Sequence, residues 1–224
     1  MVLGDTHFPW TSNKALEHIY GVAKEIKPAV VIQVGDLYDM YSFSRYPVDP
    51  NTTSPEREVE RGFRGAEKMW STFRRVAPQA RLVQLLGNHD DRASKRMNET
   101  LPAVKCLADR GLRGLFTFEG VETIHDPTEE FFLGSVVYMH GHRSKLGDHA
   151  RHNQMSTVCG HSHHGGVVWH RNRRGPYFEL NAGWLGDEKA PVFRYGAQKT
   201  LRGWTTGFGI VDERGPRFVC LGGR

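Results

Sequence analysis

Three apolar runs rich in β-branched residues each end in a polar cluster. They cover residues 2–4, 29–34 and 81–86, and they precede Asp5, Asp36 and Asn88. Runs of this kind are typical of strands buried on both faces of a parallel sheet. Between them, residues 13–27 and 55–76 have helical patterns, with start signals at Ser12 and at Ser54-Pro55. This alternation of strand and helix predicts right-handed βαβ units.

The second half of the chain has shorter apolar runs separated by turn signals. We expect strands at 130–140, 157–160, 166–170, 177–180 and 208–211, and short helices near 100–110 and 144–152. Residues 41–53 are expected to form a long loop near Asp36. No repeat and no linker marks a boundary, so we predict an α/β fold with one domain over residues 1–224, built from two packed sheets flanked by helices.

Composition narrows the class of protein. With 38% hydrophobic and 25% charged residues in 224, the chain can bury a core and is not a disordered tail. Its three cysteines, Cys106, Cys159 and Cys220, share no CxxC spacing, which argues against a disulfide framework and fits a reducing compartment. The N-terminus lacks the pattern of a signal peptide, and no run approaches 18 apolar residues. We therefore expect a cytoplasmic protein without a membrane partner.

Histidine is unusually abundant, with 12 residues in the chain, and five short polar motifs follow the ends of predicted strands. They are Asp5-Thr6-His7, Gly35-Asp36-Leu37-Tyr38-Asp39, Gly87-Asn88-His89-Asp90, His140-Gly141-His142 and Gly160-His161-Ser162-His163. Imidazole, carboxylate and amide donors without thiolate suit Mn²⁺, Fe, Ni²⁺ or Zn²⁺, and one ion could not use so many donors. Two divalent ions are therefore predicted, about 3.5 to 4 Å apart and sharing a carboxylate and a hydroxide.

In this order, the motifs resemble the calcineurin-like metallophosphoesterase superfamily, whose pattern is DxH, GDxxD, GNH(D/E), a lone His and GHxH. The resemblance implies a four-layer α/β/β/α sandwich of two mixed sheets. The segment 36–92 is also similar to small stand-alone members common in phages and prophages, and the sequence has no insertion large enough for a capping domain. By resemblance, the first metal is bound by Asp5, His7, Asp36 and His163. The second is bound by Asp36, Asn88, His140 and His161, with Asp36 bridging and Mn²⁺ the expected ion.

The resemblance also implies roles beside the metals. His89 would bind the phosphoryl oxygen and assist the leaving group, and Asp39 would orient it. Arg92, Arg45 and His142 are further hypotheses for contacts with substrate, each weighed against a plain structural role. We expect Asp90 to bond nearby backbone or a ligand. A solvated polar face is expected for His149, His152 and His164.

Residues 141–177 form a basic segment that contains six Lys and Arg residues and one acidic residue, Asp148. With Trp169 and Tyr177 among them, these cations could hold a nucleic-acid backbone, although a hairpin tip at 171–176 explains several of them equally well. The leading hypothesis is two-metal hydrolysis of phosphate esters, with a phosphodiester such as nucleic acid or a nucleotide preferred. The alternatives are a phosphomonoesterase or protein phosphatase, and a non-catalytic scaffold, which would be expected to lose ligands.

Overall fold

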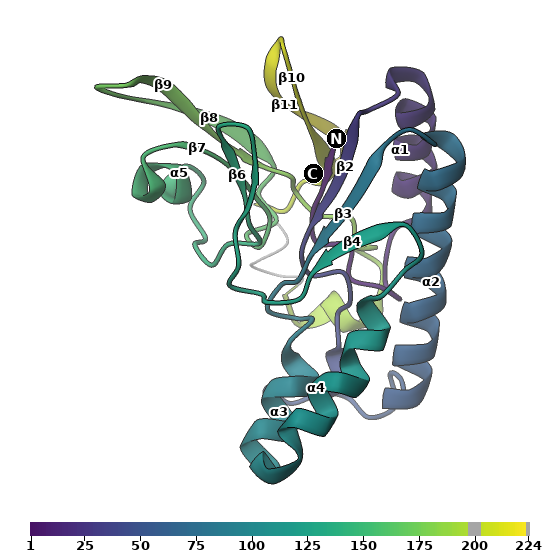
Figure 1. Ribbon diagram of the computed structural model, residues 1–224. Coiled ribbons are helices and arrows are strands. Elements are labelled where there is room, and N and C mark those ends of the chain that lie inside the picture. The colour runs from purple at the N-terminus through teal and green to yellow at the C-terminus, as the bar shows by residue number, and fades with distance from the viewer. Residues whose placement is uncertain (197–202, 223–224) are drawn as a thin grey trace.

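Two mixed β-sheets form the centre of the fold (Figure 1). The computed structural model describes residues 1–196 and 203–222. The first sheet has the order β11-β10-β1-β2-β3-β4 and the second has the order β5-β6-β7-β9-β8. The strands of the first sheet are β1 (Val2–Leu3), β2 (Val30–Val34), β3 (Arg81–Leu85), β4 (Val121–Ile124), β10 (Thr206–Asp212) and β11 (Gly215–Gly222). Those of the second are β5 (Phe131–Leu133), β6 (Val136–Tyr138), β7 (Ser156–Cys159), β8 (Gly166–Asn172) and β9 (Gly175–Asn181).

Helices cover the outer face of each sheet. Helices α1 (Asn13–Ile26) and α2 (Pro55–Val76) lie against the first sheet, and the short α5 (Asp148–Asn153) lies against β7 and β9 of the second. Helices α3 (Arg92–Thr100) and α4 (Lys105–Arg113) extend beyond the end of the first sheet (Figure 1). This order of layers confirms the expected α/β/β/α sandwich. No helix in the described ranges is both long and apolar enough to cross a membrane.

The predicted start signals of the two long helices act as caps. The side chain of Ser12 accepts a hydrogen bond from the backbone N–H of Ala15 at the start of α1. Ser54 does the same for Arg57 at the start of α2, where Pro55 occupies the first helical position. Each cap satisfies a backbone donor that has no partner within the helix, so the helices begin where the sequence predicts.

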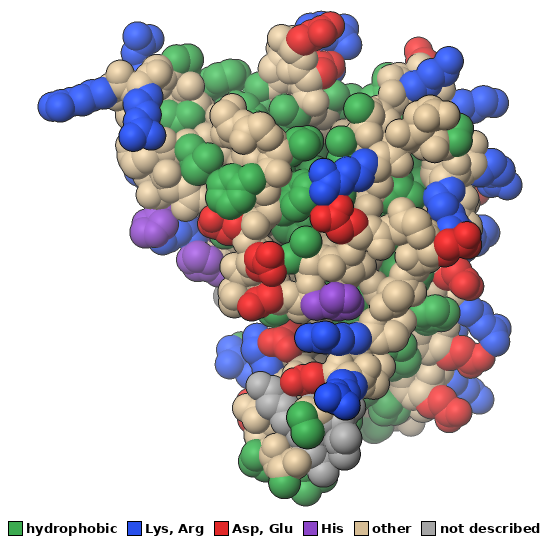
Figure 2. Space-filling model, in the orientation of Figure 1, with side chains coloured by type: hydrophobic (Ala, Val, Ile, Leu, Met, Phe, Trp, Pro, Cys, Tyr) green, Lys and Arg blue, Asp and Glu red, His purple; other side chains and the backbone are tan. Residues whose placement is uncertain are grey.

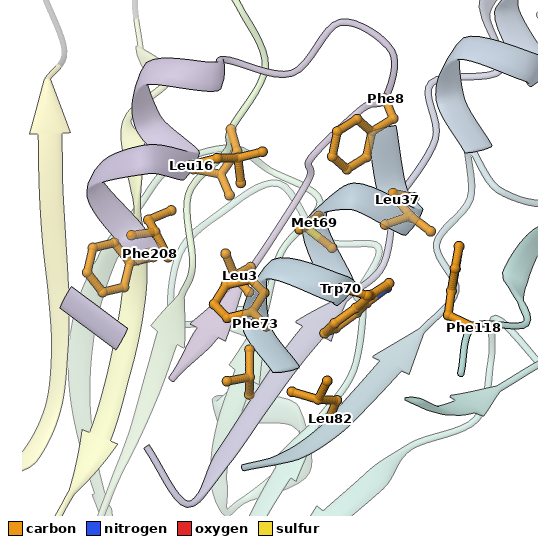
Figure 3. Close-up of a cluster of buried hydrophobic side chains, with 14 of the residues drawn as sticks. Leu3, Phe8, Leu16, Leu37, Met69, Trp70, Phe73, Leu82, Phe118 and Phe208 are labelled. Atoms are coloured by element: carbon orange, nitrogen blue, oxygen red, sulfur yellow. The ribbon is translucent and has the colours of Figure 1, made fainter. Parts of the chain in front are cut away.

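The central strands of the first sheet are mainly apolar because both of their faces are buried. Leu3 and Leu82 pack with Met69, Trp70 and other side chains of α1 and α2 (Figure 3). The alternate positions, among them Val2, Ile32 and Val83, pack instead against the second sheet. The core therefore has one layer on each face of the first sheet, as the apolar runs in the sequence predict.

Several elements differ from the sequence-based expectation. The single strand expected at 130–140 is a hairpin of β5 and β6, since Gly134 turns the chain with φ +61°. Helix α3 and strands β4 and β11 were not expected, because their residues are largely half-buried or exposed and their apolar pattern is weak. The expected helix at 100–110 is a 3-10 turn followed by α4, and the helix expected from 144 begins at Asp148. The segment 41–53 contains one 3-10 turn, Tyr41–Phe43, and is otherwise a loop.

Candidate metal centre

The five motifs meet at one edge of the two sheets. Strands β1, β2 and β3 run parallel in the first sheet, and β6 and β7 run parallel in the second, so the loops after these strands leave the same side. All seven proposed ligands lie in these loops. Five of them are buried and two are half-buried: Asp5, His7, Asp36, His140 and His163, and then Asn88 and His161.

The first cluster of donors contains Asp5, His7, Asp36 and His163, whose ligand atoms all lie within 4.8 Å of one another. The Nε2 atoms of His7 and His163 are 3.2 Å apart. His163 Nε2 is also 3.2 Å from Asp5 Oδ1. Ligands bound at about 2.0 to 2.2 Å to one divalent ion stand roughly 3 Å from each other, so this cluster has the spacing of a metal site.

The second cluster contains Asn88, His140 and His161. The Oδ1 atom of Asn88 is 3.0 Å from His140 Nε2 and 2.8 Å from His161 Nδ1, and the two ring nitrogens are 3.3 Å apart. Asp36 Oδ1 is 3.3 Å from His140 Nε2. Asp36 therefore belongs to both clusters, which is the position that a bridging carboxylate requires.

Polar contacts on the far side of two rings orient them toward the clusters. His140 Nδ1 lies 3.0 Å from the carbonyl oxygen of Val34, and His7 Nδ1 lies 3.1 Å from Asp39 Oδ2. These partners keep the proton on Nδ1 and leave Nε2 free to act as a ligand, an arrangement that is general for histidines that bind metals.

Charges within the centre keep its carboxylates ionised. Burial alone would raise the pKa of Asp36, but the imidazole of His140, by its charge and its hydrogen bond, holds that pKa well below its usual value. Burial lowers the pKa of His140, yet the carboxylate of Asp36 reverses this and raises it to about 9. Anionic carboxylates beside imidazoles that give up protons to a cation suit a metal site.

Most of the proposed ligands have a backbone conformation that residues other than glycine rarely adopt. Five of them adopt left-handed backbone with φ between 49° and 68°: Asp5, His7, Asp36, His161 and His163. Each such residue costs on the order of 1–3 kcal/mol, and such costs concentrate at functional sites. The strain indicates that these loops are shaped by the geometry of the donors.

The glycines of the motifs serve two different purposes. Gly35 has φ +99° and turns the chain after β2. Gly87 and Gly160 do not have positive φ. A Cβ atom at Gly87 would collide with the carboxylate of Asp36, and one at Gly160 would collide with that of Asp5. These two glycines leave room for the carboxylates.

His89 lies beside the clusters, and its ring is oriented by the backbone of Asp39. His89 Nδ1 is 3.0 Å from the carbonyl oxygen of Asp39, whereas the Asp39 carboxylate is 3.7 Å away and lies closer to His7 Nδ1, at 3.1 Å. Arg92 lies 2.9 Å from His89 Nε2 and donates a 2.8 Å hydrogen bond to the same Asp39 carbonyl. Burial lowers the pKa of His89 to about 3, so the ring is neutral and accepts from Arg92. His7, Asp39 and His89 thus form a polar group next to the metal centre, with one ring nitrogen or carboxylate oxygen from each lying within 4.8 Å of the others.

Asp90 has the structural role expected of it. Its carboxylate accepts hydrogen bonds from the backbone N–H groups of Leu37, Tyr38 and Gly87, at 3.1, 2.8 and 2.8 Å. It therefore ties the loop after β2 to the loop after β3. Burial and the charge of Asp36 raise the pKa of Asp90 to about 7.

The expectation for His149 is wrong. His149 is only 2% exposed, and its Nε2 accepts hydrogen bonds from the backbone N–H groups of His142 and Arg143, at 3.0 and 3.1 Å. The side of α5 that carries it packs on the second sheet, near Glu179 and Cys159, rather than facing solvent. His149 thereby holds the loop that follows His140. His152 is exposed and His164 is half-buried.

Sequence reasoning missed a group of residues that support the last motif. Asn181, at the end of β9, donates hydrogen bonds to the carbonyl of Gly160 and the hydroxyl of Ser162, at 2.6 and 3.1 Å. Trp184 stacks on the ring of His163 at a centroid distance of 5.6 Å. Phe193 meets the edge of His7 at 5.7 Å. No motif spacing marks these residues, since they follow the last ligand in an ordinary run of apolar and polar positions.

Two cavities adjoin the metal centre, and Asn88 and Lys95 line both. The first, of about 410 Å³, is also lined by His89, Arg92 and Arg45, three of the residues predicted to contact substrate or act in catalysis. The second, of about 610 Å³, is lined by His140 and His142. The centre therefore opens on two sides. The remaining lining residues of the first cavity are Phe43, Ser44, Tyr46, Arg96 and Glu99.

The end of the predicted basic segment lies away from the metal centre. β9 runs parallel to β7, so Asn181 stands beside Cys159 at the edge that holds the ligands, and the hairpin tip between Asn172 and Gly175 is at the opposite end. Six residues at about 3.3 Å each place the tip roughly 20 Å away. Figure 2 shows Lys and Arg side chains at this projecting tip. The predicted hairpin is confirmed, but the cations at its tip are not beside the last two motifs.

This fold and site define a class of metal-dependent phosphoesterases, and comparison of the sequence agrees. A family model for calcineurin-like phosphoesterases matches residues 1–217, so the chain belongs to that family. The predicted family is thus confirmed. The chain is a hydrolase of phosphoesters, and the family implies that it uses divalent metal ions.

Particular relatives are similar over most of their length. Two are gene 54 proteins, from Mycobacterium phages D29 and L5, each 26% identical to this chain over 100% of it and 94% of the relative. A solved phosphoesterase, Yfce from E. coli, is 18% identical over 95% of this chain and 87% of that one, with a TM-score of 0.41.

Proposed function

We propose that this chain is a phosphodiesterase that uses two divalent ions, with Mn²⁺ preferred, and that it acts as a single domain. The observation that carries the proposal is the convergence of seven donors into two clusters that share Asp36. The first cluster, with Asp5, His7 and His163, would hold one ion. Asn88, His140 and His161 would hold the other. When bound, such a pair supplies a water of lowered pKa and a clamp for phosphoryl oxygens.

The residues beside the clusters would act on the substrate. His89 is half-buried at the edge of the centre, and its Nε2 accepts a hydrogen bond from Arg92. A polar group of the substrate could replace Arg92 at this atom. We assign His89 to a phosphoryl oxygen and the leaving group, and Arg92 to the negative charge that develops there. Asp39 orients both through its carbonyl and holds His7 through its carboxylate.

The two cavities favour a diester over a monoester. A phosphodiester carries an organic group on each of two oxygens, whereas a monoester carries one. Asn88 lines both cavities, of about 410 and 610 Å³, and each offers a place for one of these groups. A phosphomonoesterase or protein phosphatase would leave one of them unused. His142 lines the second cavity, where it would meet one of the groups.

The proposal is tested by metal analysis together with a panel of substrates. With Mn²⁺ supplied, we expect two ions per chain and faster hydrolysis of bis-p-nitrophenyl phosphate than of p-nitrophenyl phosphate. Cyclic dinucleotides and single- and double-stranded DNA complete the panel. Asp36→Asn should lose both bound metal and turnover, because an amide leaves two divalent charges under-compensated.

Asp49→Asn is the matched control, since Asp49 lies in an exposed turn where its side chain accepts from Asn51. It should bind metal and turn over substrate like the parent. Near-normal activity and two ions in Asp36→Asn would reject the metal assignment. A preference for the monoester would reject the diesterase and favour the alternative phosphomonoesterase.

A further inference from the structure

Cations are concentrated in the smaller cavity, along one face of α3. Arg92, Lys95, Arg96 and Glu99 stand at spacings of three and four residues, so they share a face of the helix. Arg45, from the loop that follows β2, lines the same cavity. We call this cavity the α3 groove. Among its lining residues there are four cations and one carboxylate, and one end of the groove is Asn88 and His89 of the metal centre.

Arg92 differs from the other three cations. Its side chain is only 19% exposed and is held by Asp39 and His89 at 2.8 and 2.9 Å. Because Arg92 lies beside His89, we assign it to the reacting phosphate. A phosphate elsewhere in the groove would have to be bound by the remaining cations.

Those three cations have partners that a phosphate can replace. Lys95 is 61% exposed and 3.2 Å from Asp91, and Arg96 is 49% exposed and 3.5 Å from Glu99. Arg45 is exposed, and within the described part of the chain its hydrogen-bond partner is the hydroxyl of Tyr46, at 3.2 Å. Exposed pairs of this kind contribute about 0–1 kcal/mol. A phosphate offers three charged oxygens to guanidinium and ammonium donors and competes well for them.

We propose that the α3 groove binds a second phosphate of the substrate, next to the ester that is cut. This inference rests on the proposed diesterase. Along the helix axis, Arg92 and Arg96 are about 6 Å apart, so one face of α3 would contact the reacting phosphate and its neighbour. The substrate is then a nucleotide or oligonucleotide diester that carries a further phosphate. The basic hairpin tip cannot serve the same role, at roughly 20 Å from the centre.

The test compares substrates that differ by one phosphate. The groove variant is Arg45→Gln with Lys95→Gln and Arg96→Gln. The control variant, Arg171→Gln with Arg173→Gln and Arg174→Gln, loses the same charge from the hairpin. Each is assayed on the thymidine dinucleotide TpT and on the same dinucleotide with a terminal phosphate at either end, pTpT or TpTp. A deoxythymidine decamer distinguishes a strand from a small nucleotide.

In the parent, we expect a terminal phosphate at one end to raise kcat/KM at least about tenfold. The groove variant should bring this ratio close to one, and the control variant should keep it. A ratio is insensitive to partial unfolding, which lowers both rates together. If the natural substrate is a strand, the salt dependence of decamer cleavage should also be weaker in the groove variant, with a slope smaller by about 0.7 because the contact with one phosphate is lost. If the groove variant loses the preference for the phosphorylated dinucleotide but keeps the salt dependence of the parent on the decamer, the natural substrate is a small nucleotide.

A second readout does not need turnover. Calorimetric titration of the metal-free protein with the phosphorylated dinucleotide and with TpT should show tighter binding of the former in the parent and in the control variant. An equal ratio in the parent and the groove variant, by kinetics and by calorimetry, overturns the second-phosphate site. Failure of the parent on every diester, with calorimetric selectivity retained, instead rejects the diesterase and leaves the groove as an anion site.

Discussion

At the scale of single residues, His89 and His140 show how neighbours decide the role of a side chain. Both are motif histidines close to Asp36. The Nδ1 of His140 is occupied by a carbonyl on the side away from the cluster, so its Nε2 points at the ligands. The Nδ1 of His89 is held by Asp39, and its Nε2 is 2.9 Å from Arg92 but 3.8 Å from the Asp36 carboxylate. This difference fits the proposed roles, in which His140 binds metal and His89 meets substrate.

This difference gives a prediction for His89→Ala. The variant should retain both metal ions and lose roughly 10² to 10⁴ in kcat, the usual contribution of a positioned acid or base. Elemental analysis of the purified variant and steady-state kinetics on a bis-ester measure the two quantities. His18→Ala, on the exposed face of α1, is the control and should change neither. Loss of one ion from His89→Ala would place His89 among the ligands and remove its assigned role.

At the scale of elements, Glu179 of β9 anchors helix α5 to the second sheet. The carboxylate of Glu179 is 1% exposed and accepts hydrogen bonds from the N–H groups of Gly147 and Ala150, at 2.7 and 2.9 Å. A helix of six residues has little stability of its own, so it depends on such contacts. Because His149 on this helix anchors the chain after His140, Glu179 supports the second cluster indirectly.

Glu179→Gln should therefore destabilise the fold by about 1–3 kcal/mol, since the amide group cannot accept both hydrogen bonds. Burial raises the pKa of Glu179, but His149 and the two N–H groups outweigh it and lower the pKa below its ordinary value of 4.5. A lowered pKa means that the carboxylate stabilises the fold above pH 4.5 and less as pH falls further.

Urea unfolding of parent and variant at several pH values measures this difference. The difference in the free energy of unfolding should be largest at neutral pH and should decrease at acidic pH. Glu188→Gln, at an exposed position, should unfold like the parent throughout. Equal midpoints for Glu179→Gln and the parent at neutral pH would show that Glu179 does not support α5.

Elements buried on both sides could be predicted from the sequence, and exposed ones could not. Strands β2 and β3 lie inside the first sheet, so most of their positions are apolar and all but the first of each are buried, which makes the pattern clear. Strand β4 lies at its edge and is half-buried or exposed, which leaves no clear periodicity. The ligand motifs could be found because their residue types and order are distinctive. Asn181 and His149 could not, because only the folded chain brings them beside the loops that they hold.

At the scale of the whole molecule, the metal centre lies between the two sheets. The first sheet supplies Asp5, Asp36 and Asn88, and the second supplies His140 and His161. Each proposed ion therefore has donors from both sheets, as Asp5 with His163 and Asn88 with His161 illustrate. Bound metal would cross-link the two halves of the sandwich, and its removal should weaken the fold as a whole.

The last prediction follows from this placement. Ions that bind only the folded protein stabilise it by about 2.7 kcal/mol per site at a concentration one hundred times Kd. For a chain of this size, 1 kcal/mol raises Tm by roughly 2–4 °C, so one occupied site should add about 5–11 °C. Thermal unfolding of the chelated protein with increasing Mn²⁺ measures the shift. Asp36→Asn, which loses the shared ligand, should show a much smaller one. Two bound ions with no rise in the Tm of the parent would mean that the metal does not tie the sheets together.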